Sequence, residues 1–507
     1  MKYTLYLLML LSGAVYTAES QSITLSQSFA GNGNYIIGKY KDEILIYNLA
    51  FITKYQLLDI YDTKMNLLRQ ISLPLPAKSF GFTFLKCDDF FYIFYQHQSG
   101  RTVSLYALKV GMDGKQTGPP KELDKTPELD FWRQNKIYSV AVSENKKYLT
   151  AFKIDNTYGP TTTITTLLFN DSLKLLHRSV LDAPIVDGVE FFSEFNVDND
   201  GNFLFVKNCE LDNIADVAKS TGLAVKSALS DSIYFMHLLP NDINANDIRL
   251  KIDNLNGHYI ITALYTSDAQ RNIDGLYCLV LDKLTHEPLY ARKTIFNEGL
   301  RKESGQEGPL KTAFNYLELQ NIHLRKDGGF VVDAGFFYTT PRTNENVRWR
   351  KFFYETDKLA CGYLDVNENP HNVYDPWRNI PNRPWGMSAV CNNITAFSFD
   401  SSANPEWIKI LPAAQIGDPG GMGYLSFKIG NQLYYIHNET VKGTIFLTAQ
   451  TVNREGEVSG DLLFKDLDRT LEYKEEFYPR ESLQVDDKEV IMPLRKGNYI
   501  CFAKIDF

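Results

Sequence analysis

The sequence lacks an excess of basic residues. Its 53 lysines and arginines are outnumbered by 61 aspartates and glutamates, which gives a net charge of −8 at pH 7. Nucleic-acid binding needs a basic surface that neutralises phosphates. The composition therefore argues against nucleic acid as a partner.

Long apolar runs are also scarce. The clearest, Tyr3 to Val15, follows Met1 and Lys2 and is short for a membrane-spanning helix. Ala18 and Ser20 are suitable for cleavage before Gln21. We therefore favour a signal peptide at 1–20 over an uncleaved anchor. The mature protein is then secreted or periplasmic, or lies in the cell envelope, as a monomer without a transmembrane segment.

Cysteine is rare, with six in 507 residues, so the chain is not a small disulfide scaffold. Export permits a disulfide. Cys361 and Cys391 are the best candidate pair, because both lie in the one long irregular segment. Cys278 and Cys501 lie in strand-like runs and are interpreted as buried thiols. The sequence leaves the pairing of four cysteines open: Cys87, Cys209, Cys278 and Cys501.

Helix signals are nearly absent. The clearest is LDNIADVAKS, residues 211–220, where Asp212 is placed to cap a short helix. Phe296 to Tyr316 is interpreted as a polar, exposed connection. Elsewhere, runs of four to eight residues rich in aromatic and β-branched side chains are bounded by Gly, Asn, Asp and Lys. This pattern predicts an all-β protein.

One hairpin recurs along the chain as an apolar strand, a polar turn and a second apolar strand. Its turns near Asn145, Asp200 and Asn256 are about 55 residues apart. The eight copies begin at these residues: Asn34, Gly81, Tyr138, Phe192, Arg249, Asn321, Leu425 and Val490.

A second hairpin follows most copies, and two hairpins form a four-stranded antiparallel sheet. Repeated sheets of this kind predict a β-propeller of seven or eight blades. The N-terminal strand SITLSQSF has no partner nearby, and the chain ends on an unfinished sheet. We expect these two to pair and close the ring. Tandem β-sandwiches are the structural alternative.

The hairpins with Asp-Gly turns, such as LRKDGGFVVDAGFF, resemble those of secreted, uncharacterised β-propellers of Bacteroidetes-type bacteria. The resemblance concerns the fold and implies a single propeller domain at 21–507. WD dipeptides, kelch glycine pairs and sialidase boxes are missing. No catalytic residue is therefore carried over from a known family.

The run FNVDNDGNFLFV resembles the start of a calcium loop, with Asn196, Asp198 and Asp200 spaced two apart before Gly201. The twelfth position of such a loop requires a bidentate carboxylate, but here it is Lys207. The copies at the other hairpins favour a turn between two strands. The histidines occur singly, and His323 is interpreted as structural. We expect no metal and no cofactor.

One segment, 339–392, interrupts the repeat between two hairpins. It holds three of the five tryptophans, and Trp and Arg are enriched at binding hot spots. We predict that it binds a ligand through these residues: Trp349, Tyr374, Trp377, Arg378, Arg383 and Trp385. The alternative is that these side chains pack the insertion onto its own blade.

These features favour a propeller that binds a protein, peptide or glycan through its loop face and this insertion. One alternative is an extracellular glycan hydrolase or lyase acting at the central funnel, and another is a structural module of the cell envelope. No G-x-S-x-G nucleophile motif occurs. The loop GDPGGMG, residues 417–423, lacks the Lys and Ser/Thr of a phosphate loop and is interpreted as a connection between blades.

Overall fold

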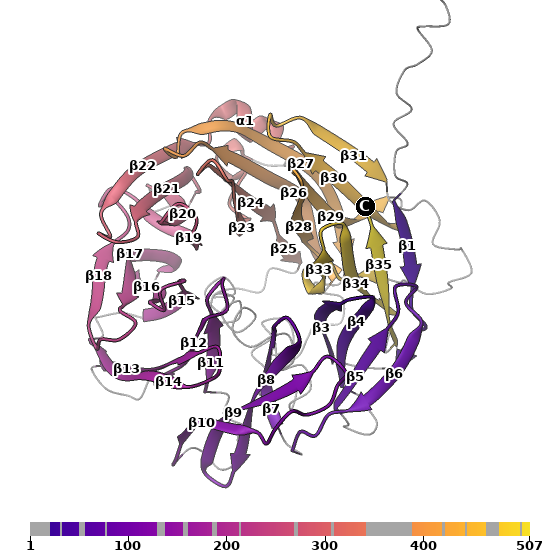
Figure 1. Ribbon diagram of the computed structural model, residues 1–507. Coiled ribbons are helices and arrows are strands. Elements are labelled where there is room, and N and C mark those ends of the chain that lie inside the picture. The colour runs from indigo at the N-terminus through magenta and orange to yellow at the C-terminus, as the bar shows by residue number, and fades with distance from the viewer. Residues whose placement is uncertain are drawn as a thin grey trace, which may run out of the picture.

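Four-stranded antiparallel sheets follow one another along the chain and are arranged radially around one axis (Figure 1). Eight such sheets, or blades, form a ring, so the expected β-propeller is confirmed with eight blades. The computed structural model describes these residues: 21–30, 33–49, 56–76, 79–128, 137–155, 161–184, 190–211, 214–267, 272–305, 309–340, 388–417, 421–441, 444–462, 476–496 and 499–507.

The first four blades each take four consecutive strands, with the innermost strand first in sequence. Blade 1 has β3 (Gly33–Tyr40), β4 (Glu43–Leu49), β5 (Gln56–Tyr61) and β6 (Leu67–Ser72). Blade 2 has β7 (Ser79–Lys86), β8 (Phe90–Ser99), β9 (Thr102–Gly111) and β10 (Lys121–Thr126). Blade 3 has β11 (Ser139–Val142), β12 (Tyr148–Asp155), β13 (Thr161–Asn170) and β14 (Leu175–Pro184). Blade 4 has β15 (Glu190–Val197), β16 (Phe203–Leu211), β17 (Ile214–Lys226) and β18 (Ile233–His237).

Blades 5 to 7 repeat this order, and blade 6 carries one extra short strand. Blade 5 has β19 (Asn244–Asp253), β20 (His258–Thr266), β21 (Gly275–Asp282) and β22 (Pro288–Ile295). Blade 6 has β23 (Leu317–Leu324), β24 (Phe330–Phe336), β26 (Ser388–Phe399) and β27 (Pro405–Gly417), with β25 (Tyr338–Thr340) beside β26. Blade 7 has β28 (Tyr424–Ile429), β29 (Gln432–Val441), β30 (Thr444–Val452) and β31 (Val458–Leu462).

Blade 8 joins the two ends of the described chain. Its inner edge is split into β32 (Glu476–Phe477) and β33 (Leu483–Asp486), which both pair with β34 (Glu489–Lys496). β34 pairs with β35 (Tyr499–Asp506), and β35 pairs with β1 (Ser22–Leu25) and β2 (Phe29–Ala30) (Figure 1). Ring closure by the N-terminal strand is confirmed. The hairpin from Val490 was wrongly taken as the inner pair of its blade, because the short β33 precedes it.

Helices are few among the described residues, but their positions differ from the prediction. The helix expected at 211–220 is wrong, since β17 runs there and pairs with β16. Sheet pairing overrides the weak capping signal. A short helix, α1 (Glu298–Glu303), lies instead between blades 5 and 6, where the Asn297 side chain accepts from the Leu300 N–H. This connection is also less exposed than predicted, because Phe296 and Phe314 are buried.

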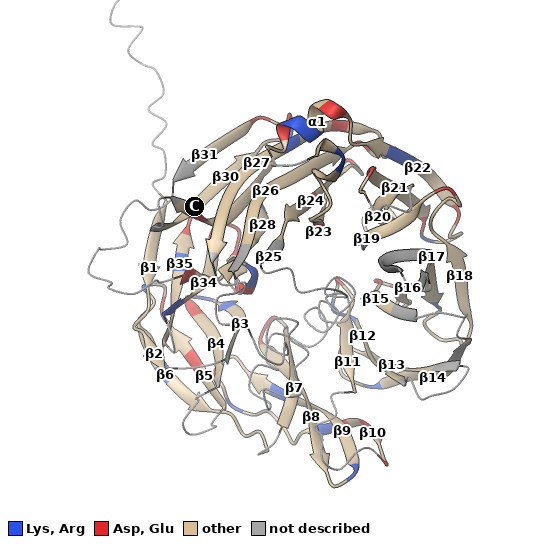
Figure 2. Cartoon of the chain, turned by 180° about the vertical axis from the view of Figure 1, so that it is seen from behind, with Lys and Arg blue, Asp and Glu red and all other residues tan. Residues whose placement is uncertain are grey.

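Two single-turn 3-10 helices complete the helical elements of the described chain: η1 (Leu310–Thr312) and η4 (Pro479–Glu481). No helix in the described ranges is long and apolar enough to cross a membrane. Residues of both charge signs are distributed around the ring (Figure 2).

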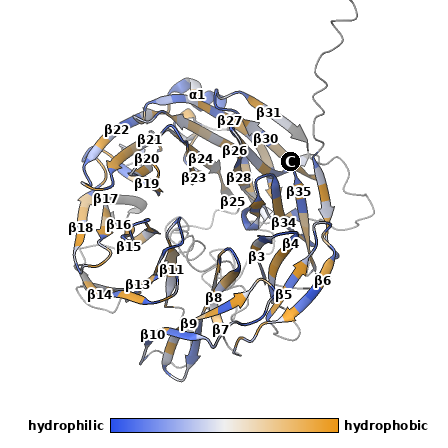
Figure 3. Cartoon of the chain, viewed as in Figure 1, coloured by the Kyte–Doolittle hydropathy of each residue, from blue (hydrophilic) through white to orange (hydrophobic). Residues whose placement is uncertain are grey.

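The hydrophobic core is divided among the interfaces between blades. One cluster joins blades 1 and 2 through Tyr47 and Ile93, and another joins blades 8 and 1 through Phe502 and Ile46, all fully or almost fully buried. The middle strands are covered on both faces, so β24 is buried along its whole length. The outer strand β6 is mostly exposed, and apolar and polar residues alternate along the strands (Figure 3). Each blade therefore depends on both neighbours.

The hairpin turns between first and second strands, and between third and fourth strands, lie at one end of the ring, here called the turn face. The antiparallel order of the strands requires this, and contacts between turns confirm it. The Asn145 N–H donates to Oδ1 of Asn199 at 2.9 Å, and the Asn199 N–H donates to Oδ1 of Asn254 at 3.2 Å. These bonds connect the inner turns of blades 3, 4 and 5. The opposite end is called the connection face.

The calcium-like run is one of these hairpin turns, as the repeat predicted. Oδ1 of Asp198 accepts the N–H groups of Asp200 and Asn202 at 2.9 and 2.8 Å. Gly201 has φ 86°, which favours glycine. Oδ2 of Asp198 accepts the Tyr259 hydroxyl of blade 5 at 2.9 Å, and Lys283 Nζ lies 3.4 Å away. The carboxylate therefore stabilises a turn and an interface.

We predict that Asp198→Ala destabilises the protein more than Asp62→Ala. Both carboxylates hold a turn of the same form, but Asp198 is fully buried, whereas Asp62 is only partly buried. Losing Asp198 removes the acceptor of the Tyr259 hydroxyl and one of the two carboxylates that contact Lys283, the other being Asp200, at a cost of roughly 2 kcal/mol. Urea unfolding of both variants measures the difference. Equal losses would contradict the role of Asp198 between blades.

Candidate functional site

The residues predicted to bind a ligand lie outside the described part of the chain. Trp349, Tyr374, Trp377, Arg378, Arg383 and Trp385 all fall within 341–387, as does Cys361. Cys391 is on β26 and is buried. The binding role of the insertion and the Cys361–Cys391 pair stay predictions.

The described flanks of this segment locate its two ends. Thr340 of β25 pairs with Ser388 of β26, so the segment leaves and re-enters blade 6 at neighbouring positions. Both positions lie at the connection face, because β24 runs away from the turn at Gly328. A site formed by the insertion would begin at that face.

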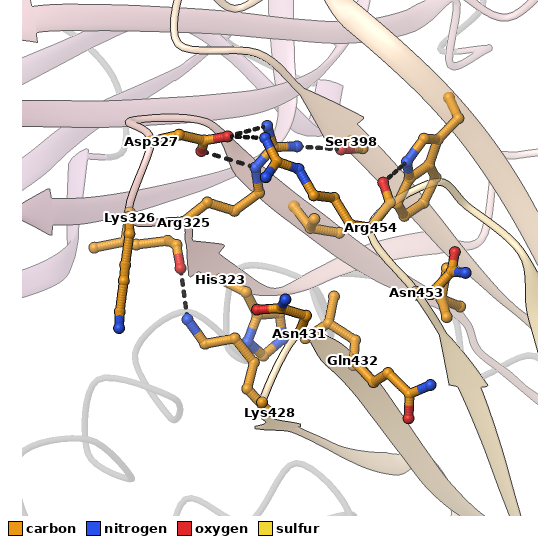
Figure 4. Close-up of a pocket in the computed structure, with 16 residues that line it drawn as sticks. His323, Arg325, Lys326, Asp327, Ser398, Lys428, Asn431, Gln432, Asn453 and Arg454 are labelled. Carbon is orange, nitrogen blue, oxygen red and sulfur yellow. Dashed lines mark hydrogen bonds and ion pairs between the residues drawn. The ribbon is translucent and has the colours of Figure 1, made fainter. Parts of the chain in front are cut away.

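The structure shows a different candidate at the turn face. A cavity of about 440 Å³ lies between blades 6 and 7, in the size range of small-molecule pockets (Figure 4). It is bordered by the end of β23, the turn into β24, the end of β28 and the outer turn of blade 7. Polar and aromatic side chains that line it include His323, Arg325, Lys326, Trp407, Lys428 and Arg454.

An ion-pair network fixes one wall of this pocket. Arg325 makes paired contacts with both oxygens of Glu406 and also binds Asp327. Arg454 of blade 7 binds the same Asp327 carboxylate at 2.7 Å, which joins the two blades. The hydrogen bond from Arg325 lowers the pKa of Asp327 to about 2. Trp407 Nε1 donates to the Arg454 carbonyl at 2.9 Å and orients that turn.

A second wall carries the cations Lys326 and Lys428 without acidic partners among the described residues, and Lys251 of blade 5 acts on Lys428 from outside the pocket lining. The Lys428 ammonium donates to the Leu324 carbonyl at 2.5 Å (Figure 4), while the Lys251 and Lys326 side chains are exposed. Burial lowers the pKa of Lys428, and the charges of Lys251 and Lys326 lower it further. None of the three forms an ion pair with a carboxylate among the described residues. The electrostatic repulsion is relieved when an anion binds nearby.

His323, which lines the pocket, also contacts a serine and an aspartate, but not as a catalytic triad. His323 Nε2 is 2.8 Å from Asp333 Oδ2 and 3.0 Å from Ser426 Oγ. A triad needs the acid and the nucleophile on opposite ring nitrogens. Nε2 carries at most one proton, so it cannot donate to Asp333 and accept from Ser426 together. His323 is thus held structurally, as predicted.

Asp333 itself serves the interface between blades 6 and 7. Its carboxylate is fully buried and accepts the Asn321 N–H at 2.9 Å and the Tyr424 hydroxyl at 3.1 Å. Asn321 Nδ2 in turn donates to Ser426 Oγ at 2.8 Å. These bonds connect the inner strand of blade 7 to two strands of blade 6. They give the pocket a rigid floor.

Carboxylates on the inner strands of blades 4 and 5 also serve the fold. Glu194 accepts the Leu250 N–H at 2.8 Å, and Asp247 accepts the Leu319 N–H at 2.7 Å, each in the next blade. Arg249 lies 3.4 Å from both carboxylates. Each carboxylate lies at a β-bulge, which turns it toward the neighbouring strand. The pair is therefore engaged in blade-to-blade contacts rather than set as an acid and a base.

No family model and no curated protein matches the chain. Solved structures with a similar fold include the Dos1 propeller, at 10% identity over 95% of each chain and a TM-score of 0.43. The polysaccharide lyase Uly1 is 8% identical over 94% of this chain and 90% of that one, with a TM-score of 0.40. By architecture, the chain is an eight-bladed β-propeller.

A prolyl endopeptidase is also similar, at 7% identity and a TM-score of 0.41. The match covers 94% of this chain but 55% of that one, so this chain spans about half the length of the peptidase. Similarities at these levels say nothing about what the propeller binds or catalyses.

One position of the repeated inner turn distinguishes blade 6 from its neighbours in the sequence. The second position of the inner turn is Asn199 in blade 4 and Asn254 in blade 5, and both side chains accept a neighbouring N–H. Blade 6 has Lys326 there instead. A cation at a position that elsewhere connects blades indicates a local change of role. Lys428 comes from blade 7, and only the arrangement of the blades in the ring brings it to the same pocket as Lys326.

We predict that the contribution of Asp327 to stability depends on pH. Its pKa is lowered from 3.8 to about 2 in the folded protein, so its ion pairs stabilise the fold above pH 3.8. This contribution is lost as the pH falls toward 2. Asp327→Asn should therefore reduce the free energy of unfolding at neutral pH, and its difference from wild type should shrink with acid. Urea unfolding across the pH range measures this; a constant difference would contradict it.

Proposed function

We propose that the protein is an exported propeller that binds an acidic protein, peptide or glycan ligand in the pocket between blades 6 and 7. The observation that carries this proposal is the pair Lys326 and Lys428, which line the pocket without carboxylate partners among the described residues, with the charge of Lys251 acting on Lys428 from blade 5. An anionic group on the ligand would supply the missing negative charge.

The walls of the pocket support a binding role. Trp407 is partly exposed, and its indole is fixed by the hydrogen bond to the Arg454 carbonyl and by packing on Gly456. An aromatic ring held in place presents apolar area at little entropic cost. The Arg325–Asp327–Arg454 network sets the rim before a ligand arrives. Preorganised charges favour recognition, because fewer side chains have to lose conformational entropy on binding.

We also propose that the insertion is a second contact region, since its described flanks lie at the opposite face. Its flanks are fixed by the Thr340–Ser388 pair, which roots 341–387 on the rim of blade 6. Its Trp and Arg content supports a role in binding.

Export fits this role, since binding an extracellular or envelope partner requires the mature chain to leave the cytoplasm. We infer removal of residues 1–20 from the small residues Ala18 and Ser20 before Gln21. N-terminal sequencing of the native protein should begin at Gln21. Any start upstream of Gln21 would reject this cleavage site.

We predict that a variant with Lys251, Lys326 and Lys428 all changed to Gln binds its acidic ligand about tenfold more weakly. Lys115→Gln is the matched control, because Lys115 is an exposed turn lysine in blade 2, with 84% of its side chain accessible. Arrays of peptides and glycans with acidic and neutral members measure the change. A wild-type preference for neutral members, or unchanged binding by the triple variant, would reject the proposal.

We predict that Trp377→Ala and Trp385→Ala together weaken binding of ligands that contact the insertion. Large aromatic residues at an interface commonly contribute more than tenfold each. The same arrays, with thermal unfolding as a check on the fold, provide the measurement. If binding is unchanged in a folded double variant, the insertion is not a contact region.

A further inference from the structure

Arg480 lies on a short projection from the inner edge of blade 8. The 3-10 helix Pro479–Glu481 separates β32 from β33, and both of these strands pair with β34. The Tyr478 N–H bonds the Pro493 carbonyl, so the strand is interrupted only between these pairings. Residues of the projection are therefore displaced from the sheet while both of its ends are held.

The Arg480 side chain reaches past blade 7 to blade 6. Its guanidinium lies over the Phe337 ring, 5.2 Å from the centroid, at the end of β24. The side chain also packs against Gly423, the residue before β28, where an added Cβ would lie 2.2 Å from Nε of Arg480. Gly423 has φ 98°, so a larger residue is disfavoured there. Three blades thus hold Arg480 at the connection face, away from the lysine pocket.

This guanidinium has no carboxylate partner in the described chain. Its Nε is buried and has no hydrogen-bond acceptor among the described residues. The adjacent Glu481 is bound to Arg495 at 2.5 Å, and Arg495 also stacks on Tyr478. Glu476 packs beside Gly421, and no ion pair within the described ranges joins it to Arg480. A buried donor without an acceptor is costly and calls for a specific explanation.

A second hydrogen-bond donor without an acceptor among the described residues lies near Gly423. Gln415 is buried on β27, and its Oε1 accepts the Gly423 N–H at 3.0 Å. That bond fixes the amide, yet Nε2 of Gln415 is buried and has no acceptor among the described residues. A guanidinium and an amide N–H group therefore meet around Gly423. The guanidinium has the planar fork of donors that a carboxylate accepts, and Gln415 holds the adjacent Gly423 in place.

We propose that Arg480, supported by Phe337 and assisted by Gln415, anchors a second binding site that recognises a carboxylate group. The site lies at the connection face and shares no residue with the lysine pocket, so it does not depend on the function proposed above. The carboxylate belongs either to an acidic amino acid or to a sugar acid. Both present the same planar anion to the guanidinium fork.

The test uses the full-length protein and two acids, each paired with a neutral analogue. N-acetylglutamate α-amide is compared with N-acetylglutamine α-amide, and glucuronate with glucose, at constant ionic strength. Calorimetric titration and the shift in thermal unfolding measure binding. We expect one acid to bind more tightly than its analogue, which also identifies the source of the carboxylate. Arg480→Gln should weaken this binding at least tenfold.

Two further variants distinguish binding at Arg480 from binding elsewhere on the protein. Arg480→Lys keeps the charge but loses the planar fork, so we expect intermediate binding. The variant with Lys251, Lys326 and Lys428 changed to Gln should bind the acid as wild type does. The proposal is overturned if neither acid binds better than its analogue. It is also overturned if Arg480→Lys, folded as wild type, binds with unchanged affinity, or if the lysine variant alone loses binding.

Discussion

The structure depends on one constraint, which is that each blade has two apolar faces and cannot bury both by itself. Neighbouring blades supply the cover, and a hydrophobic cluster lies at each interface of the described ring. An open series would leave one apolar face at each end. Pairing of β1 with β35 removes both ends at once. Ring closure is therefore a requirement of burial rather than an added feature.

The same constraint determines where polar groups are placed. At the inner strands, β-bulges turn Glu194 and Asp247 toward backbone donors of the next blade, so these carboxylates hold neighbouring blades together. At the turn face, Asn145, Asn199 and Asn254 form a chain of contacts between successive turns. Most buried polar groups near the axis thus serve the fold. Cations without a carboxylate partner in the described chain, the exposed Lys326 and the partly buried Arg480 among them, are therefore the candidates for ligand binding.

Much of the fold could be predicted because its determinants are local. Turn residues and alternating apolar positions lie within one hairpin, so copies were recognised without knowing how they pack. The errors have local causes too. A weak cap signal at Asp212 suggested a helix where pairing with β16 imposes β17. The four-residue β33 was overlooked, which displaced the last hairpin by one strand.

The candidate sites were less predictable, because their residues are far apart in the chain. Sequence alone determined the all-β class, the repeated blades and the pairing of the terminal strand, since each follows from contiguous hairpin patterns or an unpaired end. Only the tertiary structure decided that Lys326 meets Lys428 and that Arg480 reaches Phe337. Such meetings depend on the number of blades and on where each strand ends. The ring geometry sets both, and no short stretch of sequence encodes them.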